Sequence, residues 1–503
     1  MRLPQLGRRR GRGANGNGSP VYRQIALHIR SEIAAGELGP GDRLPPIRNL
    51  ASDLGVNRDT VALAYESLVG EGWLESAVGR GTFVRRSASP EGRGNGEVVA
   101  LELTPQVEQL LSLENARPRF GAGKGTVSLH TLIPDPAYYP VDAFRRSFTR
   151  ALAAGGAELL TYGVPQGHAG LRSTLAERFR RAGMDVSPDE IVLCHGASQG
   201  IALSVRLFAQ GGDAVAVEQP TYHNVLTTLV GLGVRPVSVP SGPAGPDLAV
   251  LERVLSDPDV KAFYTIPSFH NPMGTSTSLP ARRELIEVAA RCQTPLIEDA
   301  FEMDLRFEGR SVPPLAGLDS RGLVVHLFSF SKSLFPGLRV GSVTARGRTV
   351  EGLLALKRAS DLSDSLPMQA ALEDFVRAGA YDRHLGLLRR MLRVRRDVML
   401  EALESEMPEG TVWTRPEGGY QVWVELPFDI DTRDLLPDAA RAGVLFAPGA
   451  QFNHDGRPSR CLRLTVAQAD EDEIRRGVAT LGRVVRERLD ASPASRQSAG
   501  VHL

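Results

Sequence analysis

Lysine is scarce in this sequence, and one lysine lies among side chains suited to covalent chemistry on a carbonyl compound. The 503-residue chain has 59 basic residues, and only four of them are lysines: Lys124, Lys261, Lys332 and Lys357. Lys332 follows an apolar run in the order Ser329-Phe330-Ser331-Lys332-Ser333. A partly apolar pocket lowers the pKa of a lysine, so that its free amine can attack a carbonyl carbon. Lys124 lies in a Gly-rich stretch, Lys261 precedes a strand and Lys357 lies in an amphipathic helix among arginines, so Lys332 is the candidate nucleophile.

A phosphate site and a carboxylate are predicted to accompany this lysine. Ser329, Ser331 and Arg339 offer hydroxyls and a two-pronged guanidinium to phosphate oxygens. Upstream, Gly196, Ala197 and Ser198 lie between a predicted strand and a predicted helix, where backbone N–H groups can approach a phosphate. Alone this turn is a weak signal, because many strand-to-helix turns carry glycine without a ligand.

Asp299 ends a predicted buried strand, the place where open parallel sheets put functional groups. An isolated aspartate there would be interpreted as a helix cap. Combined with a lysine and phosphate partners in this order, it meets the needs of pyridoxal 5'-phosphate (PLP): an amine for the imine, a carboxylate for the pyridine nitrogen and a phosphate cup. The sequence predicts PLP as the cofactor, with Lys332 and Asp299 as the catalytic pair and no metal.

The elements that must position these residues alternate between strands and helices. Apolar strand-like runs at 191–193, 214–217, 262–266, 295–298 and 324–329 are separated by helical stretches. This alternation predicts an α/β fold with a mainly parallel central sheet buried on both faces. Residues 411–426 and 461–466 indicate an antiparallel α+β C-terminal subdomain.

The N-terminal part has a different pattern. Residues 1–18 form an Arg-rich segment predicted to be a disordered basic arm. Tyr22, Ile25, Ile29 and Ile33 recur at helical spacing, and two shorter helices follow, joined by a Gly55 turn with Asn57 as the cap of the second. Two strands around a glycine tip complete a winged helix-turn-helix. The predicted organisation is a DNA-binding domain at 19–86, a linker at 87–126 with a short helix near 107–113, a PLP-binding domain at 127–490 and a disordered tail at 491–503.

The N-terminal segment resembles the GntR family of bacterial winged-helix regulators across about 65 residues. The matching stretches are YRQIALHIRSEIAAGELGPGDRLP, LASDLGVNRDTVALAYESLVGEGWLES and VGRGTFV. The resemblance implies double-stranded operator DNA as a partner, contacted by Arg48, Arg58, Thr60, Gly79, Arg80, Gly81 and Thr82. Pro46 and Ile47 stand where that family usually has small polar residues. A protein-interaction module is the alternative interpretation.

The rest of the chain resembles the fold type I, aspartate aminotransferase-like superfamily, and the whole chain resembles the MocR subfamily of GntR regulators. The most specific motif is FSFSKSLFPGLRVG. By this resemblance Tyr222 stacks on the cofactor ring, Asn271 donates to the ring oxygen, Tyr162 reaches the phosphate of the neighbouring subunit of a homodimer, and Arg463 receives the carboxylate of an amino acid ligand. Relatives usually have a tyrosine at the position of Phe301, and its phenol also bonds the ring oxygen. Ala197 stands where they often have Ser or Thr.

Composition excludes several other classes of protein. The formal net charge is +1, which is unlike a polybasic nucleic-acid coat. The three cysteines are widely spaced, so neither a disulfide framework nor a zinc site is indicated. No apolar run is long enough for a membrane span, and a cytoplasmic location is expected.

The sequence therefore predicts a PLP-dependent transcriptional regulator. In this hypothesis an amino acid or amine effector displaces Lys332 and forms an external aldimine, and domain closure repositions the winged helices. An active aminotransferase with an ancillary DNA-binding domain is the alternative. A regulator that keeps the fold only for dimerisation is a third possibility, which the presence of Lys332, Asp299 and Arg339 disfavours.

Overall fold

The computed structural model describes residues 21–34, 37–77, 81–85, 101–116 and 125–490. These fall into two compact units, an N-terminal unit up to Leu103 with 114–116, and a C-terminal unit of 104–113 and 125–490. No helix in the described ranges is both long and apolar enough to cross a membrane. The predicted arm, the tail and the wing residues Gly79 and Arg80 lie outside the described residues.

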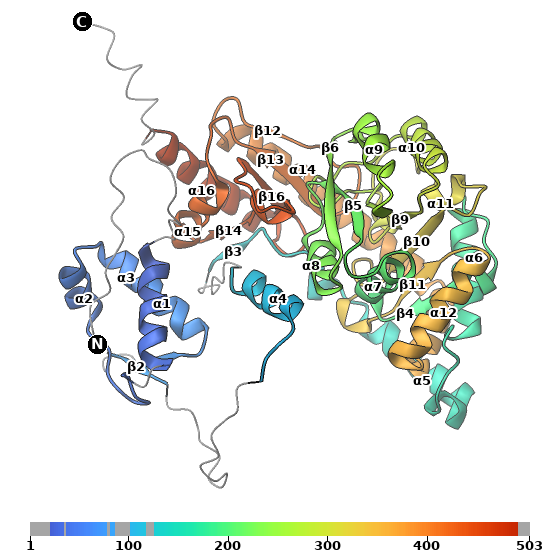
Figure 1. The fold of residues 1–503 in the computed structure, drawn as a ribbon, viewed down its shortest axis with the longest axis horizontal. Helices are drawn as coiled ribbons and strands as arrows, with labels where there is room; N and C mark the ends of the chain where they lie inside the picture. The colour runs from blue at the N-terminus through green and yellow to red at the C-terminus, as the bar shows by residue number, and fades with distance from the viewer. Residues whose placement is uncertain (1–20, 35–36, 78–80, 86–100, 117–124, 491–503) are drawn as a thin grey trace, which may run out of the picture. The chain divides into compact units, whose positions relative to one another are not determined.

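The N-terminal unit is a three-helix core with a two-stranded wing (Figure 1). Its elements are α1 (Val21–Ala34), α2 (Ile47–Leu54), α3 (Arg58–Gly70), β1 (Leu74–Ala77) and β2 (Gly81–Val84). The apolar positions of the three helices, among them Ile25, Leu50 and Leu68, meet in one buried cluster. The Oδ1 of Asn57 accepts a hydrogen bond from the N–H of Asp59, which caps α3 as expected.

The turn between α2 and α3 depends on glycine. Gly55 adopts a left-handed conformation with φ of 63°, and its N–H bonds back to Ser52. Strands β1 and β2 pair antiparallel, with Leu74 opposite Val84 and Ala77 opposite Gly81. The predicted winged helix-turn-helix is therefore present.

The C-terminal unit is built on an eight-stranded sheet in the order β4-β11-β10-β9-β8-β5-β6-β7. Its strands are β4 (Ile191–Cys194), β5 (Ala214–Gln219), β6 (Arg235–Gly242), β7 (Gly245–Pro246), β8 (Val260–Thr265), β9 (Leu296–Asp299), β10 (Val324–Ser329) and β11 (Gly341–Thr344). Strands β6, β5, β8, β9 and β10 are mutually parallel, and β11 runs antiparallel to both of its neighbours. The mainly parallel sheet is confirmed, with β11 as an antiparallel insertion.

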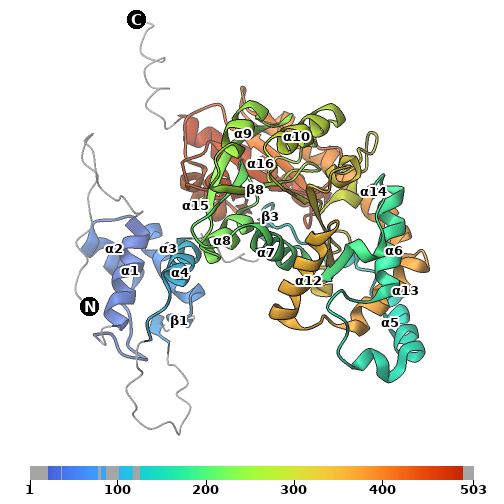
Figure 2. The same ribbon diagram turned by 45° about the vertical axis from the view of Figure 1, so that its right-hand side comes forward.

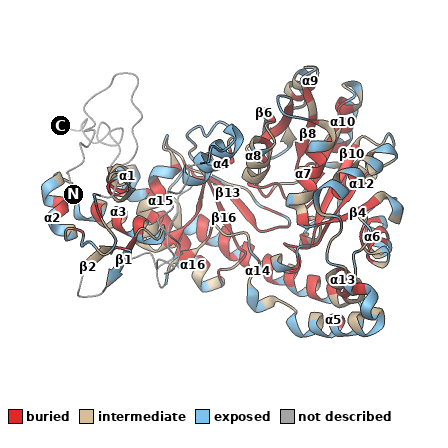
Figure 3. Ribbon diagram, turned by 60° about the horizontal axis from the view of Figure 1, so that its bottom comes forward, coloured by how far each residue is buried: buried red, intermediate tan, exposed pale blue. Residues whose placement is uncertain are grey.

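Helices cover both faces of this sheet, as near-continuous apolar strands require. One face packs on α7 (Gly196–Phe208), α8 (His223–Gly231) and α12 (Arg348–Asp361). The other packs on α9 (Leu248–Leu255), α10 (Leu279–Arg291) and α11 (Leu315–Leu318). Figures 1 and 2 show α9 and α10 above the sheet and α7 and α12 below it. Figure 3 shows the buried strands between helices whose outer faces are exposed.

Further helices surround the sheet. They are α4 (Pro105–Ala116), α5 (Val141–Gly155), α6 (Ala169–Arg181), α13 (Leu366–Arg377) and α14 (Ala380–Glu406), with the 3-10 turns η1 (Pro136–Tyr138), η2 (Gly156–Leu160), η3 (Pro188–Glu190), η4 (Met303–Leu305) and η5 (Pro336–Leu338). Helix α13 packs on α5, α6 and α14. The linker helix α4 covers the predicted 107–113, and its Leu110 approaches Gly231 at the end of α8.

The C-terminal part has its own antiparallel sheet in the order β12-β13-β16-β15, as predicted. Its strands are β12 (Val412–Trp413), β13 (Gln421–Glu425), β15 (Ala447–Pro448) and β16 (Cys461–Thr465), with α15 (Thr432–Ala442), η6 (Gly449–Phe452) and α16 (Glu471–Asp490) around them. One pairing was not predicted: β3 (Val127–Ser128) runs parallel to β14 (Val444–Leu445). This pairing joins residues 127–128 to the C-terminal part of the unit. The segment that follows, 129–132, contacts Lys332 through the backbone oxygen of Leu132.

Candidate functional site

Lys332 lies in the turn that follows β10. Ser329, the last residue of that strand, pairs with Gly341 of β11, so residues 330–340 form the connection that leaves and re-enters the sheet. The Lys332 Nζ donates to the backbone oxygen of Leu132 at 2.5 Å. Burial lowers the pKa of the amine, and the carboxyl of Glu302 opposes that shift. The amine therefore has the desolvated surroundings that favour a nucleophile.

Asp299 ends the neighbouring strand β9 and is buried. Its Oδ2 accepts a 2.6 Å hydrogen bond from the hydroxyl of Tyr264, on β8. Its Oδ1 has no hydrogen-bond partner among the described residues. Burial raises the pKa of this carboxyl to about 6, although the Tyr264 hydroxyl opposes the shift. A buried acceptor left open in this way fits a cationic ring N–H. Tyr264 was not predicted as a site residue.

Tyr222 and Asn271 follow β5 and β8, each next to a cis X-Pro bond. The Tyr222 hydroxyl accepts from Asn224 Nδ2 at 2.7 Å, and burial raises the pKa of the phenol to about 12. The Asn271 Oδ1 accepts from Arg463 at 2.9 Å. Because a guanidinium only donates, this bond sets the orientation of the amide and turns the Asn271 NH₂ group away from Arg463. That NH₂ group is the donor that the resemblance requires.

Arg463 reaches the site from β16 of the C-terminal sheet. One terminal nitrogen donates to Asn271 and the other donates to the backbone oxygen of His130 at 2.7 Å. The guanidinium lies 5.0 Å from the ring centroid of Phe452. Burial lowers the pKa of Arg463 to about 10, and its Nε has no partner in the described part of the chain. A buried guanidinium that pairs with neutral acceptors retains donors for a carboxylate.

The residues of the predicted phosphate site lie at the start of α7 and beside it. Gly196 has φ of 72°, and a Cβ at this position would lie 3.0 Å from a guanidinium nitrogen of Arg339. Arg339 in turn donates to the backbone oxygen of His195 at 2.8 Å. Ala197 and Ser198 occupy the first turn of α7, where N–H groups lack helical partners. The Ser329 hydroxyl donates to Ser331 at 3.1 Å.

Tyr162 does not join this cluster. It follows η2, and its side chain is 85% exposed. The nearby Leu160 and Val164 are also exposed. Among the described residues, Tyr162 makes no side-chain hydrogen bond and no ring contact.

The positions and burial of these residues fit the groups that PLP would need. The Asp299 Oδ1 is buried without a hydrogen-bond partner among the described residues, Gly196 has no side chain beside Arg339, and the Lys332 amine is desolvated. The charges of Asp299, Arg463 and Arg339 all shift the pKa of Lys332. Phe301 fills the position of the missing tyrosine and packs in the core on the α7 side of the sheet.

Two residues of this region, Glu302 and Lys357, were missed or misjudged from sequence. Glu302 is buried, and its charge acts on both Lys332 and Arg463. Lys357, expected on an amphipathic helix surface, has an exposed fraction of 0%. Its ammonium lies 2.8 Å from Asp361 and 3.0 Å from Asp364.

Asp364 also contacts the His195 ring at 2.5 Å, just before the phosphate cup. His195, Asp361 and Asp364 have the spacing of a metal site among the described residues, but the Lys357 ammonium already supplies the positive charge between the two carboxylates. No pattern in the sequence separates Lys357 from a surface lysine.

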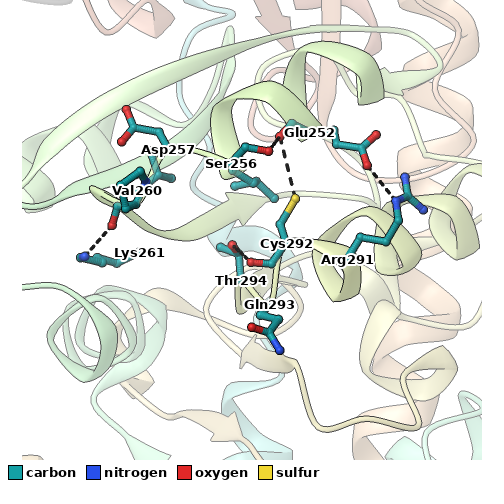
Figure 4. Close-up of a pocket in the computed structure, with 11 residues that line it drawn as sticks. Glu252, Ser256, Asp257, Val260, Lys261, Arg291, Cys292, Gln293 and Thr294 are labelled. Atoms are coloured by element: carbon teal, nitrogen blue, oxygen red, sulfur yellow. Dashed lines mark hydrogen bonds and ion pairs between the residues drawn. The ribbon is translucent and has the colours of Figure 1, made fainter.

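A separate shallow pocket lies at the other ends of the strands. It has a volume of about 610 Å³ and is lined by residues of α9, α10 and the start of β8, including Glu252, Lys261 and Cys292 (Figure 4). Lys261 donates to the backbone oxygen of Pro258, and Arg291 pairs with Glu252. The charged groups of this pocket therefore have partners within the protein, and none of the predicted cofactor residues lines it.

The predicted DNA contacts cluster at helix starts in the N-terminal unit. Arg48 and Arg58 are exposed in the first turns of α2 and α3, and Thr60 follows in α3. Gly81 opens β2 with φ of 112°, and a Cβ there would lie 3.0 Å from the Arg43 guanidinium. Arg43 is thus a further cation at the wing, beside Thr82, and it was not predicted.

Comparisons with known proteins match both units. The family "Bacterial regulatory proteins, gntR family" matches residues 21–84, and "Aminotransferase class I and II" matches residues 135–481. An uncharacterised HTH-type transcriptional regulator of Escherichia coli, YdcR, is 31% identical, over 93% of this chain and 99% of its own. The probable rhizopine catabolism regulatory protein MocR of Rhizobium meliloti is 28% identical, over 92% and 93%.

A solved structure supports the fold. The α-aminoadipate aminotransferase LysN of Thermus thermophilus, solved with N-(5'-phosphopyridoxyl)-L-leucine, has a TM-score of 0.68 at 31% identity. The match covers 77% of this chain and 96% of LysN. The chain therefore belongs to the aminotransferase class I and II family, whose members are PLP-dependent, and carries a GntR helix-turn-helix domain. A GntR-type regulator with this fusion is a member of the MocR subfamily.

Proposed function

We propose that this regulator binds operator DNA as a homodimer and senses an amino acid or amine through PLP held at Lys332. The observation that carries the proposal is the convergence of a desolvated amine, an open buried carboxylate and a buried guanidinium from three separate segments: Lys332, Asp299 and Arg463. Such groups cost stability unless a ligand satisfies them.

Each residue has a distinct role in this proposal. PLP supplies an aldehyde that condenses reversibly with amines and a pyridine ring that withdraws electrons. Lys332 provides the resident amine, and Asp299 accepts a hydrogen bond from the protonated ring nitrogen. Tyr222 stacks on the ring, and the NH₂ group of Asn271 donates to the ring oxygen. The phosphate would be held by donors from the first turn of α7 and from the connection between β10 and β11: Gly196, Ala197, Ser198, Ser329, Ser331 and Arg339.

Arg463 connects ligand binding to the rest of the protein. It is anchored on β16, and its partner Asn271 lies in a loop that follows β8 of the central sheet. Its other partner, His130, follows β3, which pairs with β14 of the C-terminal part. A ligand carboxylate that bonds this guanidinium alters contacts between the C-terminal sheet and the central sheet. Ligand binding then shifts a conformational equilibrium only to the extent that it favours one arrangement of these contacts.

The exposure of Tyr162 supports a site completed by a second subunit, since its phenol has no hydrogen-bond partner among the described residues. The exposed Arg48 and Arg58, with Thr60, Gly79, Arg80, Gly81 and Thr82, form the proposed DNA surface. Positive groups at helix N-termini suit phosphate contacts in DNA.

Absorbance and borohydride trapping test the cofactor proposal. Purified protein with PLP should show an imine band, and reduction should label the peptide that contains Lys332. Lys332→Arg should lose both signals, whereas the matched control Lys261→Arg, at the surface pocket, should keep them. A wild-type protein with no band and no label at Lys332 contradicts the proposal.

A working aminotransferase remains the second candidate, because Lys332, Asp299 and Arg463 are the groups that transamination also needs. Phe301 argues against efficient turnover, since the lost hydroxyl removes a hydrogen bond worth about 1 kcal/mol. Sustained keto acid formation from an amino acid would favour the enzyme, and a single turnover without accumulation would favour the sensor.

A further inference from the structure

A short segment, residues 129–132, lies beside the candidate site, and each of its four backbone oxygens accepts a hydrogen bond. We call this segment the carbonyl strap. Two of its bonds come from one residue of β16: the Thr465 N–H donates to the oxygen of Leu129, and the Thr465 hydroxyl donates to the oxygen of Thr131, both at 2.8 Å. Thr465 is fully buried and has no proposed contact with cofactor or ligand. These two bonds therefore do not depend on a ligand.

The other two oxygens of the strap accept from groups to which the proposed function assigns a ligand. Arg463 donates to the oxygen of His130 at 2.7 Å. The Lys332 amine donates to the oxygen of Leu132 at 2.5 Å. A carboxylate is a stronger acceptor for a guanidinium than a neutral backbone oxygen is, and a lysine amine that holds PLP keeps fewer N–H donors. A ligand therefore competes for half of the bonds that hold the strap.

Along the chain, the strap lies between the site and the linker that leads to the N-terminal unit. It directly follows β3, the first strand after the linker. The Val127 N–H donates to the oxygen of Gly443 at 2.8 Å. The Leu129 N–H continues this pairing onto the oxygen of Leu445 at 2.9 Å. A change in the bonds of the strap thus acts on the strand from which the linker departs.

Building on the proposed function, we propose that the carbonyl strap is the element that signals ligand binding to the linker. With all four bonds made, the strap is held on β16 and fixes the chain that follows the linker. When a ligand carboxylate takes Arg463 from the oxygen of His130, the strap loses one of these bonds and loosens. The signal requires a carboxylate, so the effector class is an amino acid and not a simple amine.

Hydrogen exchange of the full-length protein, measured by mass spectrometry, tests the strap without any cofactor. Thr465→Val removes one strap bond and keeps the shape of the side chain, so the amides of Val127 and Leu129 should exchange about fivefold faster, the factor that one hydrogen bond contributes. Thr344→Val is the matched control, because Thr344 is also a buried strand threonine and its hydroxyl has no partner among the described residues. Unchanged exchange in Thr465→Val, or the same acceleration in Thr344→Val, overturns the proposal.

Two reduced cofactor adducts test the ligand step. N-(5'-phosphopyridoxyl)-L-leucine carries a carboxylate, and the adduct of 3-methylbutylamine is the same molecule without it. Both should bind, and only the leucine adduct should accelerate exchange at Val127 and Leu129. The leucine adduct should also change the affinity of wild type for a DNA duplex that wild type has selected from a random pool. Thr465→Val without any adduct should change this affinity in the same direction.

The failure of the strap and the failure of the PLP site give different results. Adducts that do not bind contradict the proposed function, and the comparison of Thr465→Val with Thr344→Val then decides the role of the strap alone. A leucine adduct that binds and leaves exchange unchanged overturns the strap, as does equal acceleration by both adducts. A DNA affinity that Thr465→Val leaves at the wild-type value also overturns it.

Discussion

Substituting Asp299 by asparagine should stabilise the cofactor-free protein while weakening its hold on PLP. The carboxyl is fully buried, and its pKa of about 6 exceeds the ordinary value of 3.8. The folded state therefore disfavours the ionised form. A difference of about two pKa units at roughly 1.4 kcal/mol each gives a cost of about 3 kcal/mol at pH 8. Asparagine removes this cost and keeps an acceptor for the Tyr264 hydroxyl.

The sign and the pH window follow from the direction of the shift. Below the ordinary value of 3.8 the carboxyl is neutral in both folded and unfolded states, so asparagine brings no gain. The gain grows as pH rises towards about 6 and stays constant above it. For a domain of roughly 360 residues, 3 kcal/mol corresponds to a rise in Tm of about 4 °C.

Calorimetry of the cofactor-free proteins at pH 4 and pH 8 measures this gain, and titration with PLP measures the opposite effect. PLP should raise the Tm of wild type at pH 8 and raise that of Asp299→Asn much less, because the charged hydrogen bond to the ring nitrogen is lost. Equal Tm values at pH 8, or a gain of the same size at pH 4, would refute the assignment of Asp299 as a strained buried carboxylate. An unchanged response to PLP would refute its role towards the ring.

Three further outcomes are expected. Arg463→Gln should weaken binding of amino acids about 10- to 100-fold in absorbance titrations, through the loss of charged hydrogen bonds, while amines without a carboxylate keep their affinity; equal losses would contradict its role. Arg58→Ala should weaken operator binding about tenfold in fluorescence anisotropy without altering the PLP spectrum; unchanged affinity would argue that the helix contacts protein instead. Phe301→Tyr should lower, by less than about one unit, the pH at which bound PLP changes its absorbance, because the new hydroxyl supplies a hydrogen bond of about 1 kcal/mol; an upward shift would contradict this geometry.

Sequence patterns located the residues whose position follows from strand order. Lys332 and Asp299 each follow an apolar run, and parallel strands bring their carboxyl ends to one edge of a sheet. The Asn57 cap and the glycine turn of the N-terminal helices were predicted for a similar reason, because local chemistry decides them. The pairing of β3 with β14 was not predicted, since it joins segments of two residues each that lie far apart in the sequence.

The residues that sequence reasoning missed depend on partners from distant segments. Glu302 is buried beside Gly419, which leaves room for its carboxyl, and this relation does not show in the run Asp299-Ala300-Phe301. In the sequence, Tyr264 is an aromatic residue of a strand. Its role is visible only in the structure, where its hydroxyl donates a hydrogen bond to Asp299. Polar groups inside a core acquire a function only through packing, which no local pattern encodes.

The contacts of the site also explain how a sensor can be built from an aminotransferase fold. Arg463, Gly419 and Tyr420 belong to the C-terminal part, whereas Asp299, Asn271 and Glu302 belong to the central-sheet region, where Asp299 ends β9 and the other two lie in loops. A ligand carboxylate that binds Arg463 changes an interaction between these two parts. An enzyme needs such changes only to reset between turnovers. A regulator can use the same changes as a signal if the free and ligand-bound sites favour different arrangements of the C-terminal sheet. Binding free energy then shifts the conformational equilibrium.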